Sequence, residues 1–168
     1  MFTIKVLLRL MLALFLLAVT ALAGCVGYAL ALQSYWDAKV RVLCEKDGGT
    51  KIFEVTEITW QQHSLLLDKF GQLVIPLAGP NTGDAPLIRT EERINIRDGN
   101  PSVWRHEMII IRKSDQKILG RQVAYARVGG DLPSPAHTSS FSCPPPDTRP
   151  NLFSAVVILP NILRNGEK

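Results

Sequence analysis

The stretch LMLALFLLAVTALAGCVGYALAL, residues 10–32, sets the organisation of the chain because it contains 23 residues without a charge. As a helix it would be about 35 Å long at ~1.5 Å per residue, which is enough to cross a hydrocarbon core of about 30 Å. Lys5 and Arg9 stand just before it. Because basic residues stay on the cytoplasmic side, the sequence predicts that everything after this stretch lies outside the cytoplasm.

The end of the apolar stretch is compatible with two forms of membrane attachment. Residues 22–25 read Leu-Ala-Gly-Cys, which fits a lipobox, so residues 1–24 are interpreted as a lipoprotein signal peptide and Cys25 as the lipidation site. The apolar character continues past Cys25, so residues 10–32 also qualify as an uncleaved transmembrane helix. Both interpretations predict a bacterial cell envelope protein, membrane-anchored with its domain facing the periplasm.

The cysteine count fits an exported lipoprotein. The chain has three cysteines, Cys25, Cys44 and Cys143. An odd number in an exported protein needs an explanation, and acylation of Cys25 would leave one pair. In an oxidising compartment the sequence therefore predicts a disulfide between Cys44 and Cys143. The alternative is two buried free thiols, one of which could pair with a histidine as a nucleophile.

Residues 33–168 are predicted to form a single extracytoplasmic α+β domain. The 136 residues are enough to bury one hydrophobic core. Without Lys5 and Arg9, the chain carries 17 basic and 15 acidic residues, and no run of like charge stands out. A surface that binds nucleic acid needs clustered basic residues, so no nucleic-acid partner is predicted.

A short helix is predicted directly after the membrane segment. Ser34 would cap it, and Asp37 occupies the capping-box position three residues later. Trp36 and Val40 then fall on one face at helical spacing. Trp36 and its neighbour Tyr35 have two interpretations, an aromatic belt at the membrane surface or a stripe that packs into the core.

A tight turn and a strand are predicted after this helix. Asp47-Gly48-Gly49 is a strong turn signal, because glycine adopts positive φ without steric cost. Residues 50–58 contain Ile52, Phe53, Val55 and Ile58 among threonine, lysine and glutamate, a composition that suits a strand.

The clearest β region follows later in the chain. Residues 89–96, 103–113 and 117–128 are predicted to be three strands joined by short turns, which indicates an antiparallel meander. The second strand contains Met108-Ile109-Ile110-Ile111. We expect it to be central and covered on both faces. The domain is therefore assigned to the α+β class, with a small, mainly antiparallel sheet.

The C-terminal part is harder to assign. Residues 132–150 are rich in proline and serine and are predicted to be an irregular, proline-rich arm without a strand, with Cys143 inside it. Residues 152–159 are predicted to be a strand or a short helix.

No chemical motif stands out in the sequence. The histidines His63, His106 and His137 have no partner at the close spacing that zinc sites use, so no metal site is predicted. Glu91 and Glu92 would point to opposite faces of a strand and could not flank one glycosidic bond. The sequence contains no Gly-x-Ser-x-Gly. We predict no catalytic residue and no cofactor.

Two short motifs carry a resemblance. Cys44-Glu45-Lys46-Asp47-Gly48-Gly49 is followed by a predicted strand, and Gly129-Gly130 precedes Ser142-Cys143-Pro144. Over residues 41–146 the chain resembles an uncharacterised family of small exported, lipoprotein-like proteins of Gram-negative bacteria. The resemblance implies an envelope location and a paired-cysteine fold, and it implies no activity.

The expected function is that of a membrane-anchored envelope protein with a binding or structural role. Its expected partners are the membrane, through a lipid anchor or a single helix, and an envelope protein. Two alternatives stay open at this point. One is a single-span accessory subunit of a membrane complex, and the other is a small envelope enzyme whose site is dispersed in the sequence.

Overall fold

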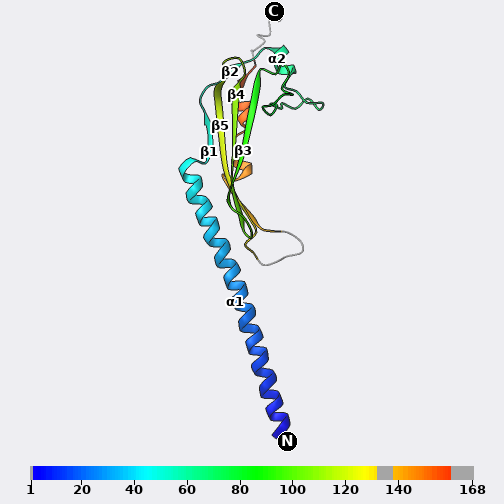
Figure 1. Cartoon of the computed structure of the whole chain (residues 1–168), viewed down its shortest axis with the longest axis vertical. Coiled ribbons are helices and arrows are strands. Elements are labelled where there is room, and N and C mark those ends of the chain that lie inside the picture. The colour runs from blue at the N-terminus through cyan, green and yellow to red at the C-terminus, as the bar shows by residue number, and fades with distance from the viewer. Residues whose placement is uncertain (1, 132–137, 160–168) are drawn as a thin grey trace, which may run out of the picture.

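A long N-terminal helix and a small antiparallel sheet make up the fold. The structure is a computed structural model that describes residues 2–131 and 138–159. Helix α1 (Phe2–Asp47) has 46 residues, and its N-terminal half extends far beyond the sheet (Figure 1). It is the one helix of the described residues that is long and apolar enough to cross a membrane, a test that a signal sequence also passes. The predicted combination of an apolar helix with a mainly antiparallel sheet is confirmed.

The predicted separate helix from Ser34 is wrong, because α1 runs without interruption through that position. Leu and Ala dominate the stretch before Ser34, and both are strong helix formers. The isolated glycines Gly24 and Gly27 are the weakest points of this stretch, and it contains no proline. One glycine costs a helix only about 1 kcal/mol, so neither ends it.

The main sheet has the strand order β1-β5-β4-β3, and β6 also pairs with β5. Its strands are β1 (Gly49–Ile52), β3 (Leu87–Arg97), β4 (Ser102–Arg112), β5 (Lys117–Val128) and β6 (Ser140–Cys143). The meander β3-β4-β5 is antiparallel, as predicted. β1 pairs with the first half of β5 and β6 with the second half, so these two short strands follow each other along one edge of β5.

Two hydrophobic clusters lie on opposite faces of the sheet. On one face, α1 packs Val40 and Cys44 against Val103, Val123 and Tyr125. On the other face, α3 (Leu152–Val156) and the segments around α2 (Trp60–Ser64) cover Leu87, Ile110 and Leu119. β4 is central, as predicted, and supplies a fully buried residue to each cluster, Val103 to the first and Ile110 to the second.

The structure corrects two further strand predictions. The strand expected over residues 50–58 is divided into β1 and the two-residue strand β2 (Thr56–Glu57), which pairs in parallel with β7 (Val157–Ile158). Residues 152–159 hold both elements that were considered, the helix α3 and the strand β7.

The proline-rich arm is not wholly irregular. Residues 132–137 lie outside the described residues. Ser140–Cys143 forms β6, so the prediction that no strand occurs there is wrong. The sequence Ser-Phe-Ser-Cys alternates small and apolar residues, and Pro144, which cannot donate to a strand ladder, ends it. After β6 comes one turn of 3-10 helix, η1 (Pro146–Thr148).

Candidate functional site

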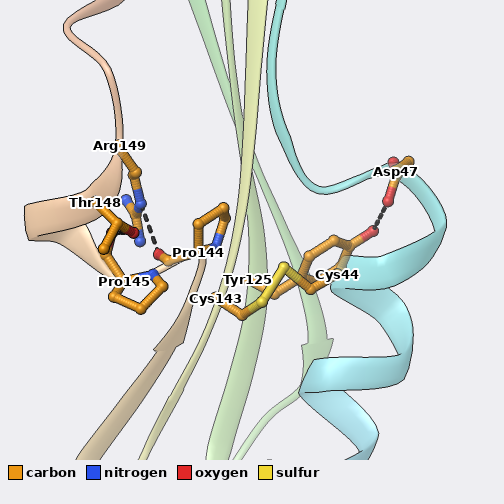
Figure 2. The surroundings of a disulfide bond; sticks show 8 residues. All are labelled: Cys44, Asp47, Tyr125, Cys143, Pro144, Pro145, Thr148 and Arg149. Carbon is orange, nitrogen blue, oxygen red and sulfur yellow. Dashed lines mark hydrogen bonds between the residues drawn. A yellow bond between two sulfur atoms is a disulfide. The ribbon is translucent and has the colours of Figure 1, made fainter.

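The predicted disulfide is present where the helix meets the sheet. Cys44 in the last turns of α1 is bonded to Cys143 at the end of β6, with the two Cα atoms 5.9 Å apart (Figure 2). The two cysteines are separated by 99 residues of sequence. Because Cys143 pairs with Tyr125 in the ladder, the disulfide joins α1 to the sheet at the point where β6 gives way to β1.

The turn after α1 depends on two glycines. The amide of Gly48 donates to the carbonyl of Cys44 at 2.7 Å. A Cβ on Gly48 would lie 2.6 Å from that carbonyl oxygen and 2.7 Å from the Cys44 sulfur, which leaves no room for a side chain. Gly49 has φ of +105°, a conformation that side chains rarely adopt. The predicted Asp-Gly-Gly turn therefore occurs as expected.

A charged cluster fixes the end of α1 on the sheet. Asp47 accepts a hydrogen bond of 2.6 Å from the Tyr125 hydroxyl and one of 3.1 Å from Arg105 (Figure 2 shows the first). Arg105 also donates to Glu107 at 2.7 Å, and Arg121 donates to the other oxygen of Glu107. The cluster thus pairs two arginines with two carboxylates, and its net charge is zero.

The pKa values of this cluster follow from its hydrogen bonds. Burial by itself raises the pKa of Asp47, but the bonds from Tyr125 and Arg105 outweigh it and lower that pKa below its ordinary value. Glu107 behaves in the same way, with Arg105 and Arg121 as the donors. Burial and the bond to Asp47 raise the pKa of Tyr125. The two carboxylates are therefore held in their charged form.

We call this charged cluster the first ionic clamp. A second ionic clamp lies closer to the apolar N-terminal part of α1. The Arg127 side chain is 1% exposed, and its Nε donates to Asp37 Oδ1 at 2.5 Å. It also donates to the Gly129 carbonyl and, at 3.0 Å, to the Ser139 hydroxyl. One buried guanidinium on β5 therefore connects α1 to the residue that follows β5 and to the residue that precedes β6.

The ends of two hairpins lie beside α1 near Cys25. Asn100 accepts a hydrogen bond of 2.5 Å from the Gly130 amide, which joins the β3–β4 turn to the end of β5. Together with Arg97 and Asp131 these residues face α1 across a notch of about 290 Å³. The α1 wall of the notch consists of Cys25, Tyr28, Ala29 and Leu32.

Cys25 and the aromatic pair have different surroundings. Cys25 is an exposed free cysteine on α1. Trp36 packs against the cluster that contains Val40, and the Arg97 guanidinium lies 5.1 Å from its ring centre. Trp36 therefore belongs to the core side of the helix, whereas Tyr35 is exposed.

The structure does not bring the other chemically interesting residues into one site. His63 contacts Trp60 on α2, while His106 on β4 has Glu91 at 3.8 Å. His137 lies outside the described residues. Within residues 2–131 and 138–159, no group of three or more His, Cys, Asp or Glu side chains is placed to hold a metal ion.

Sequence reasoning missed the two clamps. Their signal was present in β5, where Arg121, Val123, Tyr125 and Arg127 alternate and so share one face of the strand. Two arginines on the covered face of a central strand require buried acceptors. Arg127 donates to Asp37 of the helix that covers that face. Arg121 donates to Glu107 on β4 and lies 3.8 Å from Asp47 of the same helix.

Comparison with known proteins does not extend this picture. No protein-family model, curated protein or solved structure matches the chain. The site therefore has to be interpreted from its own geometry.

Proposed function

We propose that this protein is a membrane-anchored bacterial envelope protein whose α+β domain stands on the periplasmic side and has a binding or structural role. The observation that carries the proposal is the contrast along α1. Its N-terminal part is apolar and exposed, while its C-terminal part is bonded to the domain by a disulfide and two ionic clamps. A rigid connection of this kind suits a domain held at a fixed distance from a membrane.

The disulfide supports the periplasmic side of this proposal. Disulfides persist in oxidising compartments such as the periplasm and are rare in the cytosol. The basic residues Lys5 and Arg9 before the apolar stretch favour the same orientation by the positive-inside rule.

A lipid on Cys25 is the first form of anchor that we propose. Stable attachment by acyl chains requires at least two of them, since a single chain gives only marginal binding. The second form is an uncleaved transmembrane helix in an accessory subunit of a membrane complex. It is favoured because α1 passes Cys25 without a break and continues as one helix to Asp47.

The intact mass of the membrane-extracted protein distinguishes the two anchors. A processed lipoprotein begins at Cys25 and carries the added mass of its acyl chains, and Cys25→Ala then accumulates as the full-length precursor. A protein with an uncleaved transmembrane helix retains residues 1–24. Its Cys25→Ala variant then differs in mass only by the change of side chain. Recovery of the protein in the soluble fraction, with neither lipid nor residues 1–24, would contradict membrane anchoring altogether.

The orientation is tested separately with reporters fused after Lys168. We expect activity from a reporter enzyme that works only in the periplasm. We expect no activity from one that works only in the cytoplasm. The opposite pattern would contradict the proposed side of the membrane.

A further inference from the structure

The surroundings of α1 change at one position. From Val6 to Cys25 every side chain is exposed, and Arg9 is the single charged residue among them. From Val26 onward, partly covered or buried positions recur every three or four residues along one face, at Val26, Ala29, Leu32, Trp36, Val40, Cys44 and Asp47. The domain therefore begins to cover the helix at Val26.

The length of the uncovered part matches a bilayer. The 20 residues from Val6 to Cys25 form about 30 Å of helix, which is the thickness of a typical hydrocarbon core. The hydroxyl of Thr20, a polar group within this part, donates to the Leu17 carbonyl at 2.9 Å, so the helix itself satisfies it. A helix of this length with exposed apolar side chains can lie in the hydrocarbon core, because its backbone hydrogen bonds are satisfied within the helix.

The covered part is apolar as far as Leu32, but polar groups lie against it. We define the tip surface as the four hairpin-end residues that line the notch, together with the exposed turn residue Asp98. The four are Arg97, Asn100, Gly130 and Asp131. Charged side chains and non-helical backbone are not tolerated where they would face lipid tails. The tip surface borders the notch opposite Tyr28 and Leu32, so this level of α1 lies above the hydrocarbon.

We propose that the outer surface of the bilayer crosses α1 at Cys25–Val26 and that phospholipid headgroups are the partner of the tip surface. This inference rests on the proposed membrane anchoring and deepens it. It moves the membrane-embedded segment from residues 10–32 to residues 6–25, with Arg9 in its first turn, where a long basic side chain extends to the cytoplasmic headgroups. Both forms of anchor place the bilayer surface at the same position along α1, because acyl chains attached to Cys25 would also enter the bilayer there.

The chemistry of the notch fits a headgroup. The Arg97 Nε donates to the Pro101 carbonyl at 2.8 Å, and within the described residues its two Nη groups have no hydrogen-bond partner. Guanidinium groups bind phosphate oxygens well. Asp131 lines the same notch and suits the ammonium group of a zwitterionic phospholipid. Tyr28 is highly exposed and stands about 4.5 Å above Cys25, at the depth where membrane proteins carry interfacial aromatic residues.

The level of the bilayer surface is tested with a matched pair of leucines. Leu22 is 66% exposed and Leu30 is 59% exposed, and they lie about 12 Å apart along α1 on either side of the proposed surface. Each is changed to cysteine in the full-length chain carrying Cys25→Ser. Spheroplasts are then treated with a charged maleimide that does not cross membranes, and the labelling is compared with that after detergent extraction.

We expect Leu30→Cys to be labelled to a similar extent before and after extraction, and Leu22→Cys to be labelled only after it. Protection of both would place the surface beyond Leu30 and would overturn the inference while leaving membrane anchoring intact. Labelling of both would place the surface before Leu22 and would also overturn the inference, whereas release of the protein from the spheroplast membranes would contradict the anchoring itself. The two failures are therefore distinguishable.

The headgroup contact is tested at the tip surface. A fluorophore is attached to Asp98→Cys, or to Ser114→Cys in the turn at the other end of β4, in full-length Cys25→Ser protein reconstituted in phosphatidylcholine vesicles. The 11 residues of β4 separate the two positions by about 35 Å. A lipid with a nitroxide on its headgroup should quench the first fluorophore and leave the second almost unchanged. Equal quenching, or none at Asp98→Cys, would overturn the contact.

Discussion

Asp37 on α1 and Arg127 on β5 are 90 residues apart in the sequence and form a two-point ion pair, with Nε–Oδ1 at 2.5 Å and Nη2–Oδ2 at 3.5 Å. The guanidinium is almost completely buried, while the carboxylate is one-fifth exposed. The pair lies between the disulfide and the exposed apolar part of α1, so it fixes the part of α1 that the disulfide does not reach.

Removing the carboxylate of this pair should destabilise the domain strongly. Asp37→Ala leaves a buried guanidinium without its counter-charge, and breaking a buried pair in this way costs roughly 3 kcal/mol or more. We expect a clear loss of unfolding free energy in urea titrations of the full-length protein in detergent micelles. The control is Lys117→Ala, which breaks the exposed ion pair with Glu54 and should leave the titration unchanged within error. Equal effects of the two substitutions would contradict a structural role for Asp37.

The disulfide should be a major source of stability. In the chain-entropy model, a bond that closes a loop of about 100 residues contributes roughly 4.7 kcal/mol, a large part of the typical total of about 5–15 kcal/mol. Reduction should therefore lower the melting temperature markedly and make residues 132–150 the first site of protease cleavage. Thiol titration of the unfolded, unreduced protein provides the check. Reaction of Cys44 and Cys143 in that titration would show that the bond is absent.

The elements that could be predicted from the sequence are those with a local signal. The meander follows from three strand-like stretches separated by short turns, and its strands lie within a few residues of the predicted ranges. The Gly48-Gly49 turn follows from glycine's conformational freedom. The pairing of Cys44 with Cys143 follows from counting, once Cys25 is set aside.

The remaining elements depend on contacts between distant segments. Asp37 was interpreted as a capping-box residue, yet it is in the middle of a helix and binds Arg127. β6 has only four residues and exists because the second half of the β5 edge is free to pair with it. β2 likewise requires the C-terminal strand β7 as its partner. A local sequence pattern cannot predict these pairings, because each requires a segment at least 12 residues away in the sequence.

A methyl group on Gly48 should destabilise the domain. Its Cβ would overlap the carbonyl and the sulfur of Cys44, and overpacking of this kind costs roughly 1–3 kcal/mol. Gly48→Ala should therefore lower the melting temperature of the oxidised protein. Gly79→Ala is the matched control, because Gly79 has open space around its Cα and no left-handed backbone. A Gly48→Ala protein as stable as the control would show that the turn has more room than the structure gives it.

Acid should weaken the attachment of α1 to the sheet through Asp47 and Glu107. The pKa values of both are lowered in the folded state, from ordinary values of 3.8 and 4.5. Below those ordinary values the unfolded chain binds more protons than the folded one, so stability rises with pH in that range. The contribution of the two carboxylates is therefore complete above about pH 5 and is lost as the pH falls through their folded pKa values.

The Tyr125 hydroxyl makes this pH dependence testable at one atom. Tyr125→Phe removes a donor to Asp47, so the folded pKa of Asp47 should move back toward 3.8 and the decline of stability in acid should become shallower. The measurement is the unfolding free energy of the full-length protein in detergent micelles from pH 3 to pH 7, by urea titration. Tyr35→Phe is the control, because Tyr35 is exposed on α1 and phenylalanine keeps its ring contact with Trp36. We expect Tyr35→Phe to reproduce the parent curve. A Tyr125→Phe curve with the parent slope would show that the hydroxyl does not hold the Asp47 carboxylate in its charged form.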